Sequence, residues 1–131
     1  MRMIIGGAFQ GKMEYAQKEY PGIRWVDGAA CSEEELLQCE GVYHFHLYIR
    51  KSMEKYEEMR LFADRIIREN PQIVIITDEI GYGLVPIDAF ERRYREETGR
   101  ICTRLAAFSE RVDRVVCGIG LPIKGGDVRR K

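Results

Sequence analysis

A glycine-rich stretch near the N-terminus, residues 6–12 with the sequence GGAFQGK, constrains this chain more than any other feature. It satisfies the pattern G-x-x-x-x-G-K, and it lies between a short apolar run at 1–5 and a segment of helical character at 12–19. Glycines let backbone N–H groups turn inward around phosphate oxygens, a helix N-terminus adds positive potential, and Lys12 can reach the β- and γ-phosphates. The stretch predicts a phosphate-binding loop for GTP or ATP, and an ordinary strand-to-helix turn is the alternative. The candidate nucleotide-binding residues are Gly6, Gly7, Ala8, Phe9, Gln10, Gly11, Lys12 and Met13.

Met13 departs from the usual form of this motif. The position after the lysine is ordinarily Ser or Thr, whose hydroxyl binds Mg²⁺. A thioether is a soft ligand and Mg²⁺ is a hard cation, so Met13 cannot replace that oxygen. We therefore expect a weakened Mg²⁺ site in a loop that still binds the nucleotide.

The rest of the chain alternates short apolar runs with longer segments of helical period, which is typical of an α/β protein with a parallel sheet. We expect a P-loop NTPase-like fold with a mostly parallel sheet of about five strands and helices on both faces, in one domain over 1–131. Expected strands lie at 1–5, 23–26, 41–49, 73–77 and 112–119, and expected helices at 12–19, 52–70 and 87–108, with a further short helix after a capping box formed by Ser32 and Glu35. A polar, glycine-rich loop at 78–83 follows the 73–77 strand, where open parallel sheets bind their ligands.

Composition excludes several classes of partner. The 21 Lys and Arg residues balance the 21 Asp and Glu residues, so the basic excess of a nucleic-acid-binding protein is absent. The four cysteines have no metal-ligand spacing and indicate reduced thiols. No apolar run reaches the roughly 20 residues that a membrane span requires. We expect a cytoplasmic protein without nucleic-acid or membrane partners.

The second half carries a resemblance to a known family. Residues 76–86 read ITDEIGYGLVP, similar to the V-S-N-E-V-G-x-G-I-V-P signature of the adenosylcobinamide kinase/adenosylcobinamide-phosphate guanylyltransferases, with Thr77 and Asp78 in place of Ser-Asn. Residues 92–100, RRYREETGR, resemble the family's R-x-F-R-D-x-x-G-R, and the N-terminal loop resembles its G-G-A-R-S-G-K-S. The similarity covers about two thirds of the chain.

The resemblance implies an enzyme of cobalamin biosynthesis that phosphorylates a corrinoid hydroxyl with a nucleoside triphosphate and then transfers GMP through a guanylylated histidine. It also suggests a homo-oligomer. The family's histidine-bearing segment is short here, without histidine between Lys12 and Tyr43, so guanylyl transfer is not expected. The third expected strand ends near Phe45–Tyr48 without the family's carboxylate.

Several polar residues are candidates for the chemistry. Glu79, after a strand facing the loop, could bind Mg²⁺ through water or act as a general base, and a structural ion pair is the alternative; Asp78 is a weaker candidate. His44 and His46, placed on one face of the 41–49 strand, could bind a metal, replace the nucleophile, or form a hydrogen-bonded pair. Arg92 and Arg95 share a helix face that suits phosphate contacts or simply faces solvent.

Two hypotheses follow from these residues. In the first, the chain is an active kinase of the corrinoid pathway or of a related small alcohol, with Lys12 and Glu79 as its catalytic residues. In the second, it is a non-catalytic nucleotide-binding subunit that kept the phosphate loop and lost the Mg²⁺ ligands. Retention of the Glu79–Pro86 motif favours the first hypothesis, and Met13 together with the missing strand-end carboxylate favours the second.

Overall fold

The computed structural model describes residues 1–80 and 88–126, and in them six strands form one sheet. Its order is β2-β3-β4-β1-β5-β6, with every neighbouring pair parallel except β5 and β6. The strands are β1 (Arg2–Gly6), β2 (Trp25–Asp27), β3 (Gly41–Tyr43), β4 (Val74–Asp78), β5 (Arg111–Val116) and β6 (Ile119–Lys124), and the helices are α1 (Lys12–Glu19), α2 (Glu33–Gln38), α3 (Phe45–Ser52), α4 (Met59–Glu69) and α5 (Ala89–Phe108). The α/β class and the mostly parallel sheet are confirmed, with six strands in place of about five.

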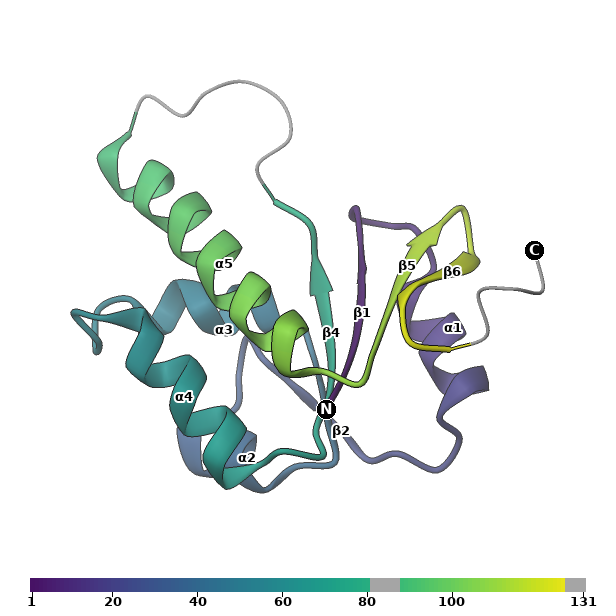
Figure 1. Cartoon of the computed structure of the whole chain (residues 1–131). Helices are drawn as coiled ribbons and strands as arrows, with labels where there is room; N and C mark the ends of the chain where they lie inside the picture. Colours follow the sequence, from purple (N-terminus) through teal and green to yellow (C-terminus); the bar gives the residue numbers. More distant parts are fainter. Residues whose placement is uncertain (81–87, 127–131) are drawn as a thin grey trace.

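Helices cover both faces of the sheet, as expected (Figure 1). Alternate residues of a strand point to opposite faces. Met3 and Ile75 pack with Phe62 and other residues of α2–α5, whereas Ile4 and Ile76 belong to a smaller apolar cluster with Ala16 of α1. Among the helices of the described residues, none is both long and apolar enough to cross a bilayer.

The expected 41–49 strand and 52–70 helix are wrong in their extents. β3 ends at Tyr43, because His44 adopts the left-handed conformation with φ 56° and is the N-cap of α3. Among the residues that follow His44, Phe45, Tyr48, Ile49 and Ser52 are buried. Their spacing of three and four residues is typical of one face of a helix. His44 and His46 therefore do not share a strand face. Ser52 ends α3, and the next helix starts only at Met59, whereas the capping box of Ser32 and Glu35 is confirmed.

The expected last strand, 112–119, is a hairpin. Cys117 and Gly118 both have positive φ, at 52° and 77°, as the two-residue turns that match strand twist require. The chain therefore reverses at Cys117 and Gly118, and residues 119–124 form β6, an antiparallel edge strand that the sequence did not predict. The expected start of the last long helix at 87, the 81–86 part of the family signature and the 127–131 tail lie outside the described residues.

A polar network fixes α1 to the sheet. The Tyr15 hydroxyl donates to Oδ2 of the fully buried Asp113 at 2.6 Å, and Arg111 makes an ion pair with the same oxygen at 2.9 Å. The Tyr15 ring also packs over Gly120, where an added Cβ would lie 2.1 Å from the ring. The N-terminal helix is thus held by β5 and β6, and with it the loop that precedes it.

Tyr15→Phe is expected to lower the free energy of unfolding by about 1–3 kcal/mol, because it removes a hydrogen bond to a charged, buried acceptor and leaves the ring in place. Urea denaturation measures this difference. Tyr20→Phe is the control, since its hydroxyl has no hydrogen-bond partner among the described residues, and it should change stability little. Equal losses in the two variants would contradict the assignment.

Candidate nucleotide-binding site

The loop between β1 and α1, the candidate phosphate loop, has a tightly turned backbone. Gly11 caps α1 with φ 84°, a conformation that glycine adopts without a steric penalty. Gly6 leaves no room for a side chain, since an added Cβ would lie 2.5 Å from the Val115 carbonyl oxygen. Phe9 has φ 60° and a fully exposed side chain. The chain therefore turns sharply at the carboxyl end of β1 and enters α1 with the helix N-terminus at the loop.

The β5–β6 turn holds the tip of this loop. The Gly118 N–H donates to the Gln10 carbonyl oxygen at 2.8 Å, and the Cys117 N–H donates to Gln10 Oε1 at 2.7 Å. An added Cβ on Gly11 would lie 3.2 Å from Gly118 Cα, so the two segments are in close contact. Through Gln10, the loop is thus held by a turn that lies more than 100 residues away in sequence.

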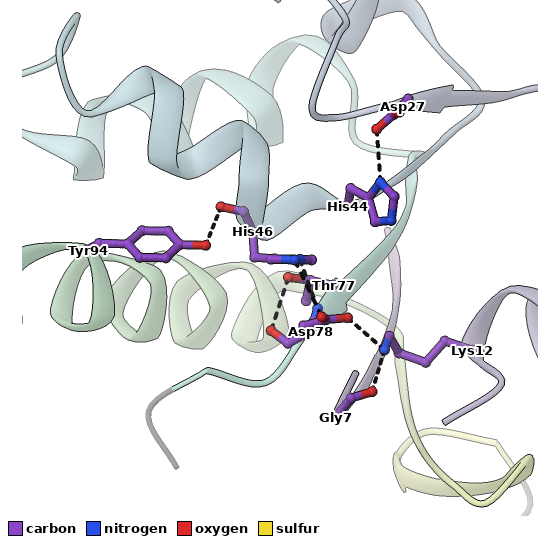
Figure 2. A network of polar contacts seen from close by, with 8 residues as sticks. All are labelled: Gly7, Lys12, Asp27, His44, His46, Thr77, Asp78 and Tyr94. Atoms are coloured by element: carbon purple, nitrogen blue, oxygen red, sulfur yellow. Dashed lines mark hydrogen bonds and ion pairs between the residues drawn. The ribbon is translucent and has the colours of Figure 1, made fainter. Parts of the chain in front are cut away.

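Lys12 is buried and has two partners (Figure 2). Its Nζ donates to the Gly7 carbonyl oxygen at 2.6 Å and forms an ion pair with Asp78 Oδ1 at 2.7 Å. The register of the sheet explains this contact, since Gly6 and Asp78 are paired at the carboxyl ends of β1 and β4. The ammonium group therefore lies at the mouth of the loop with a carboxylate beside it.

His46 continues the network behind Asp78 (Figure 2). The Asp78 N–H donates to His46 Nδ1 at 3.2 Å, and His46 Nε2 lies 3.4 Å from Asp78 Oδ2. Because Nδ1 accepts, the neutral ring carries its proton on Nε2. Burial lowers the pKa of His46, although the Asp78 carboxylate opposes this effect. The Tyr94 hydroxyl donates to the His46 carbonyl oxygen at 2.9 Å, which ties α3 to α5.

His44 has a different partner. Its Nδ1 lies 3.0 Å from Oδ1 of Asp27, at the carboxyl end of β2. The Ala29 N–H donates to the same oxygen at 2.9 Å, and this bond and the contact with His44 lower the pKa of Asp27. Asp27 was not among the residues singled out from the sequence. An acidic residue followed by glycine at the end of an expected strand was the available signal.

Lys12, His44, His46 and Asp78 line one pocket of about 420 Å³. The phosphate loop forms one side of it, and α3 with the end of β3 forms the other. Its lining residues are Ala8, Phe9, Gln10, Gly11, Lys12, Met13, Glu14, Tyr43, His44, His46, Leu47, Ile76 and Asp78. The structure thus brings the loop, both histidines and Asp78 together.

Comparison with known proteins identifies the family of the chain. A sequence model of the cobinamide kinase / cobinamide phosphate guanyltransferase family matches residues 23–123. The chain belongs to this family. The bifunctional adenosylcobalamin biosynthesis proteins CobU of Salmonella typhimurium and Escherichia coli are 37% identical over 68 residues and 42% identical over 53 residues, or 52% and 40% of this chain. CobP of Pseudomonas aeruginosa, with the same descriptive name, is 37% identical over 54 residues, or 41% of this chain.

The family match has limits along the chain. The aligned parts span 38%, 29% and 31% of the three relatives. The phosphate loop at 6–12 precedes the matched residues 23–123. Its assignment therefore rests on its own glycines, on Lys12 and on the register of β1 and β4. Together with the family match, this register supports the P-loop NTPase-like fold.

The other candidates lie away from the pocket lining. Glu79 Oε1 pairs with Arg114 Nε at 2.7 Å, and the Glu79 N–H donates to the Gly6 carbonyl oxygen at 2.7 Å. Arg92 is exposed on α5, and Arg95 lines a separate cavity between α4 and α5. The acidic side chain beside Lys12 is therefore Asp78, the candidate that the sequence ranked below Glu79.

Of the carboxylates that line the pocket in the described part of the chain, Asp78 is the one beside Lys12 and is the one suited to hold Mg²⁺. Among the described residues, no group of three or more His, Cys, Asp or Glu side chains is placed to bind a metal ion. Nucleotide-bound Mg²⁺ needs only one or two carboxylates, because phosphates and water supply the other ligands. Asp78 suits this role when Lys12 turns toward phosphates, whereas the Met13 thioether does not. The expectation of a weakened Mg²⁺ site stays a prediction.

Proposed function

We propose that this chain binds GTP or ATP at the Gly6–Lys12 loop and transfers the terminal phosphate to a hydroxyl group of a cobinamide, in cobalamin biosynthesis. The position of Lys12 carries the proposal, since its ammonium group lies 2.7 Å from Asp78 and 2.6 Å from the Gly7 carbonyl oxygen in the shared pocket. The relatives named bifunctional adenosylcobalamin biosynthesis proteins support the pathway.

The side chains would act mainly by positioning and by neutralising charge. Lys12 would leave Asp78 and contact the terminal phosphates, while loop N–H groups and the α1 N-terminus bind their oxygens. Mg²⁺, held by Asp78 directly or through water, would supply further charge neutralisation. His46 keeps Asp78 oriented from its other side. Guanylyl transfer is not part of the proposal.

A second candidate function is a non-catalytic nucleotide-binding subunit, and Met13 favours it. Calorimetric titration with GTP and ATP, with and without Mg²⁺, combined with an assay of phosphate transfer to cobinamide, separates the two. Binding with transfer supports the kinase, and binding without transfer supports the subunit. No triphosphate affinity under any metal condition would exclude both.

Met13→Ser is expected to raise Mg²⁺-dependent nucleotide affinity by about tenfold, or ~1.4 kcal/mol, because it adds the missing oxygen ligand. The same titration measures the change. Met13→Ala is the matched control, since it removes the thioether without adding a hydroxyl. If both variants bind like the wild type in the presence of Mg²⁺, the missing hydroxyl has no role in this pocket.

A further inference from the structure

The two histidines of the pocket differ in the nitrogen that each leaves available. His46 is buried, and Asp78 engages both of its ring nitrogens. His44 is half exposed and uses only Nδ1, on Asp27 (Figure 2). Because Asp27 is a carboxylate that only accepts, Nδ1 carries the proton and Nε2 carries the lone pair. No group among the described residues hydrogen-bonds to this Nε2.

The backbone holds His44 in this orientation. The residue has φ 56° and ψ 39°, an uncommon conformation for a residue with a side chain. Its carbonyl oxygen accepts from the Leu47 and Tyr48 N–H groups at 3.0 and 3.2 Å. Gly28 packs against it so closely that an added Cβ would lie 2.5 Å from that oxygen. Left-handed residues fixed by their surroundings are concentrated at active sites.

The position of His44 in the pocket suits a reaction at the terminal phosphate. Its ring centroid lies 6.0 Å from that of His46, which contacts Asp78, and Asp78 contacts Lys12. Lys12 marks where the terminal phosphates bind in the proposed function. His44 lines the same pocket, on the side formed by α3 and the end of β3, across from the loop.

We propose that His44 is the general base of this site and removes the proton from the acceptor hydroxyl through Nε2. The inference rests on the proposed phosphoryl transfer. The hydroxyl oxygen forms a bond to the terminal phosphorus as its proton passes to Nε2. The bond from that phosphorus to the bridging oxygen breaks, and its electron pair leaves with the nucleoside diphosphate. Asp27 is a positioning residue that holds Nδ1–H and stabilises the imidazolium.

His44→Asn is the principal test. Asparagine keeps an N–H donor for Asp27 and tolerates the left-handed conformation, but it has no basic nitrogen. We expect unchanged nucleotide affinity and thermal stability, with a fall of about 10²- to 10⁴-fold in the rate of phosphate transfer to cobinamide. Added imidazole should restore part of the rate in His44→Ala. Asp27→Asn should lower kcat while the KM for the nucleotide is unchanged.

Triphosphate hydrolysis, measured in parallel, separates the possible failures. Hydrolysis that depends on His44, without transfer to cobinamide, would overturn the proposed kinase and keep His44 as the base. Transfer that is equally fast in His44→Asn would overturn the base and keep the kinase. Absence of both reactions in the wild type would overturn both. A GMP or phosphate adduct mapped to His44 by mass spectrometry would make it a nucleophile and overturn the general-base role.

Discussion

Replacing Lys12 with alanine is expected to weaken GTP and ATP binding by about 100-fold or more. Hydrogen bonds to charged groups contribute about 1.5–3 kcal/mol, and 100-fold corresponds to about 2.8 kcal/mol. The substitution also leaves the Asp78 carboxylate facing the phosphates without its cation, which adds repulsion between like charges. Calorimetric titration of the wild type and of Lys12→Ala with each nucleotide measures the effect.

The control for this prediction is Lys18→Ala. Lys18 is an exposed lysine in the last turn of the same helix, so its removal changes the net charge equally without touching the pocket. It should bind nucleotides like the wild type. If Lys12→Ala also binds like the wild type, Gly6–Lys12 is an ordinary strand-to-helix turn and the proposed function falls with it.

The glycine-rich turn between β1 and α1 and the sheet class could be predicted because their signals are local. A short apolar run, a glycine-rich turn and an amphipathic segment each need only neighbouring residues to be recognised. The close packing of α1 against β5 and β6 could not be predicted this way. It depends on Tyr15, Asp113 and Gly120, which come together only when the sheet forms.

The sequence predicts a third strand longer than the observed β3, because residues 41–49 fit both a strand pattern and a helix pattern. From Gly41 to Ile49 apolar residues alternate well enough for a strand, and from Phe45 they also recur at helical spacing. The backbone conformation of His44 decides between them, and that conformation depends on Gly28, which lies in the turn after β2. The contrast between the two histidines was therefore inaccessible from sequence, and so was the partnership of His44 with Asp27.

The choice between Asp78 and Glu79 depends on the direction of side chains at the end of β4. Successive residues of a strand point to opposite faces, so only one of two adjacent carboxylates can face the loop lysine. The register of β1 and β4 selects Asp78, and Glu79 pairs with Arg114 instead. Sequence similarity to the family signature drew attention to Glu79, whereas pairing across the sheet identifies Asp78.

Asp78→Asn is expected to act with opposite signs in the absence and presence of Mg²⁺. Without the metal, the substitution removes a negative charge beside the phosphates and releases Lys12 from its ion pair, so nucleotide affinity should rise by about tenfold, or ~1.4 kcal/mol. With the metal, the variant lacks the carboxylate that fits Mg²⁺, so Mg²⁺ should no longer strengthen binding, and phosphate transfer should fall.

A double-mutant cycle with Lys12→Ala tests whether the gain in metal-free nucleotide affinity on Asp78→Asn depends on Lys12. If Asp78 weakens metal-free binding by holding Lys12, Asp78→Asn should improve affinity less in the Lys12→Ala background than in the wild type, and the two effects will not add. Additive effects would mean that Asp78 acts only through its charge on the phosphates. A fall in metal-free affinity on Asp78→Asn would show instead that the carboxylate is needed to position Lys12, and the ion pair would then belong to the binding-competent state of the loop.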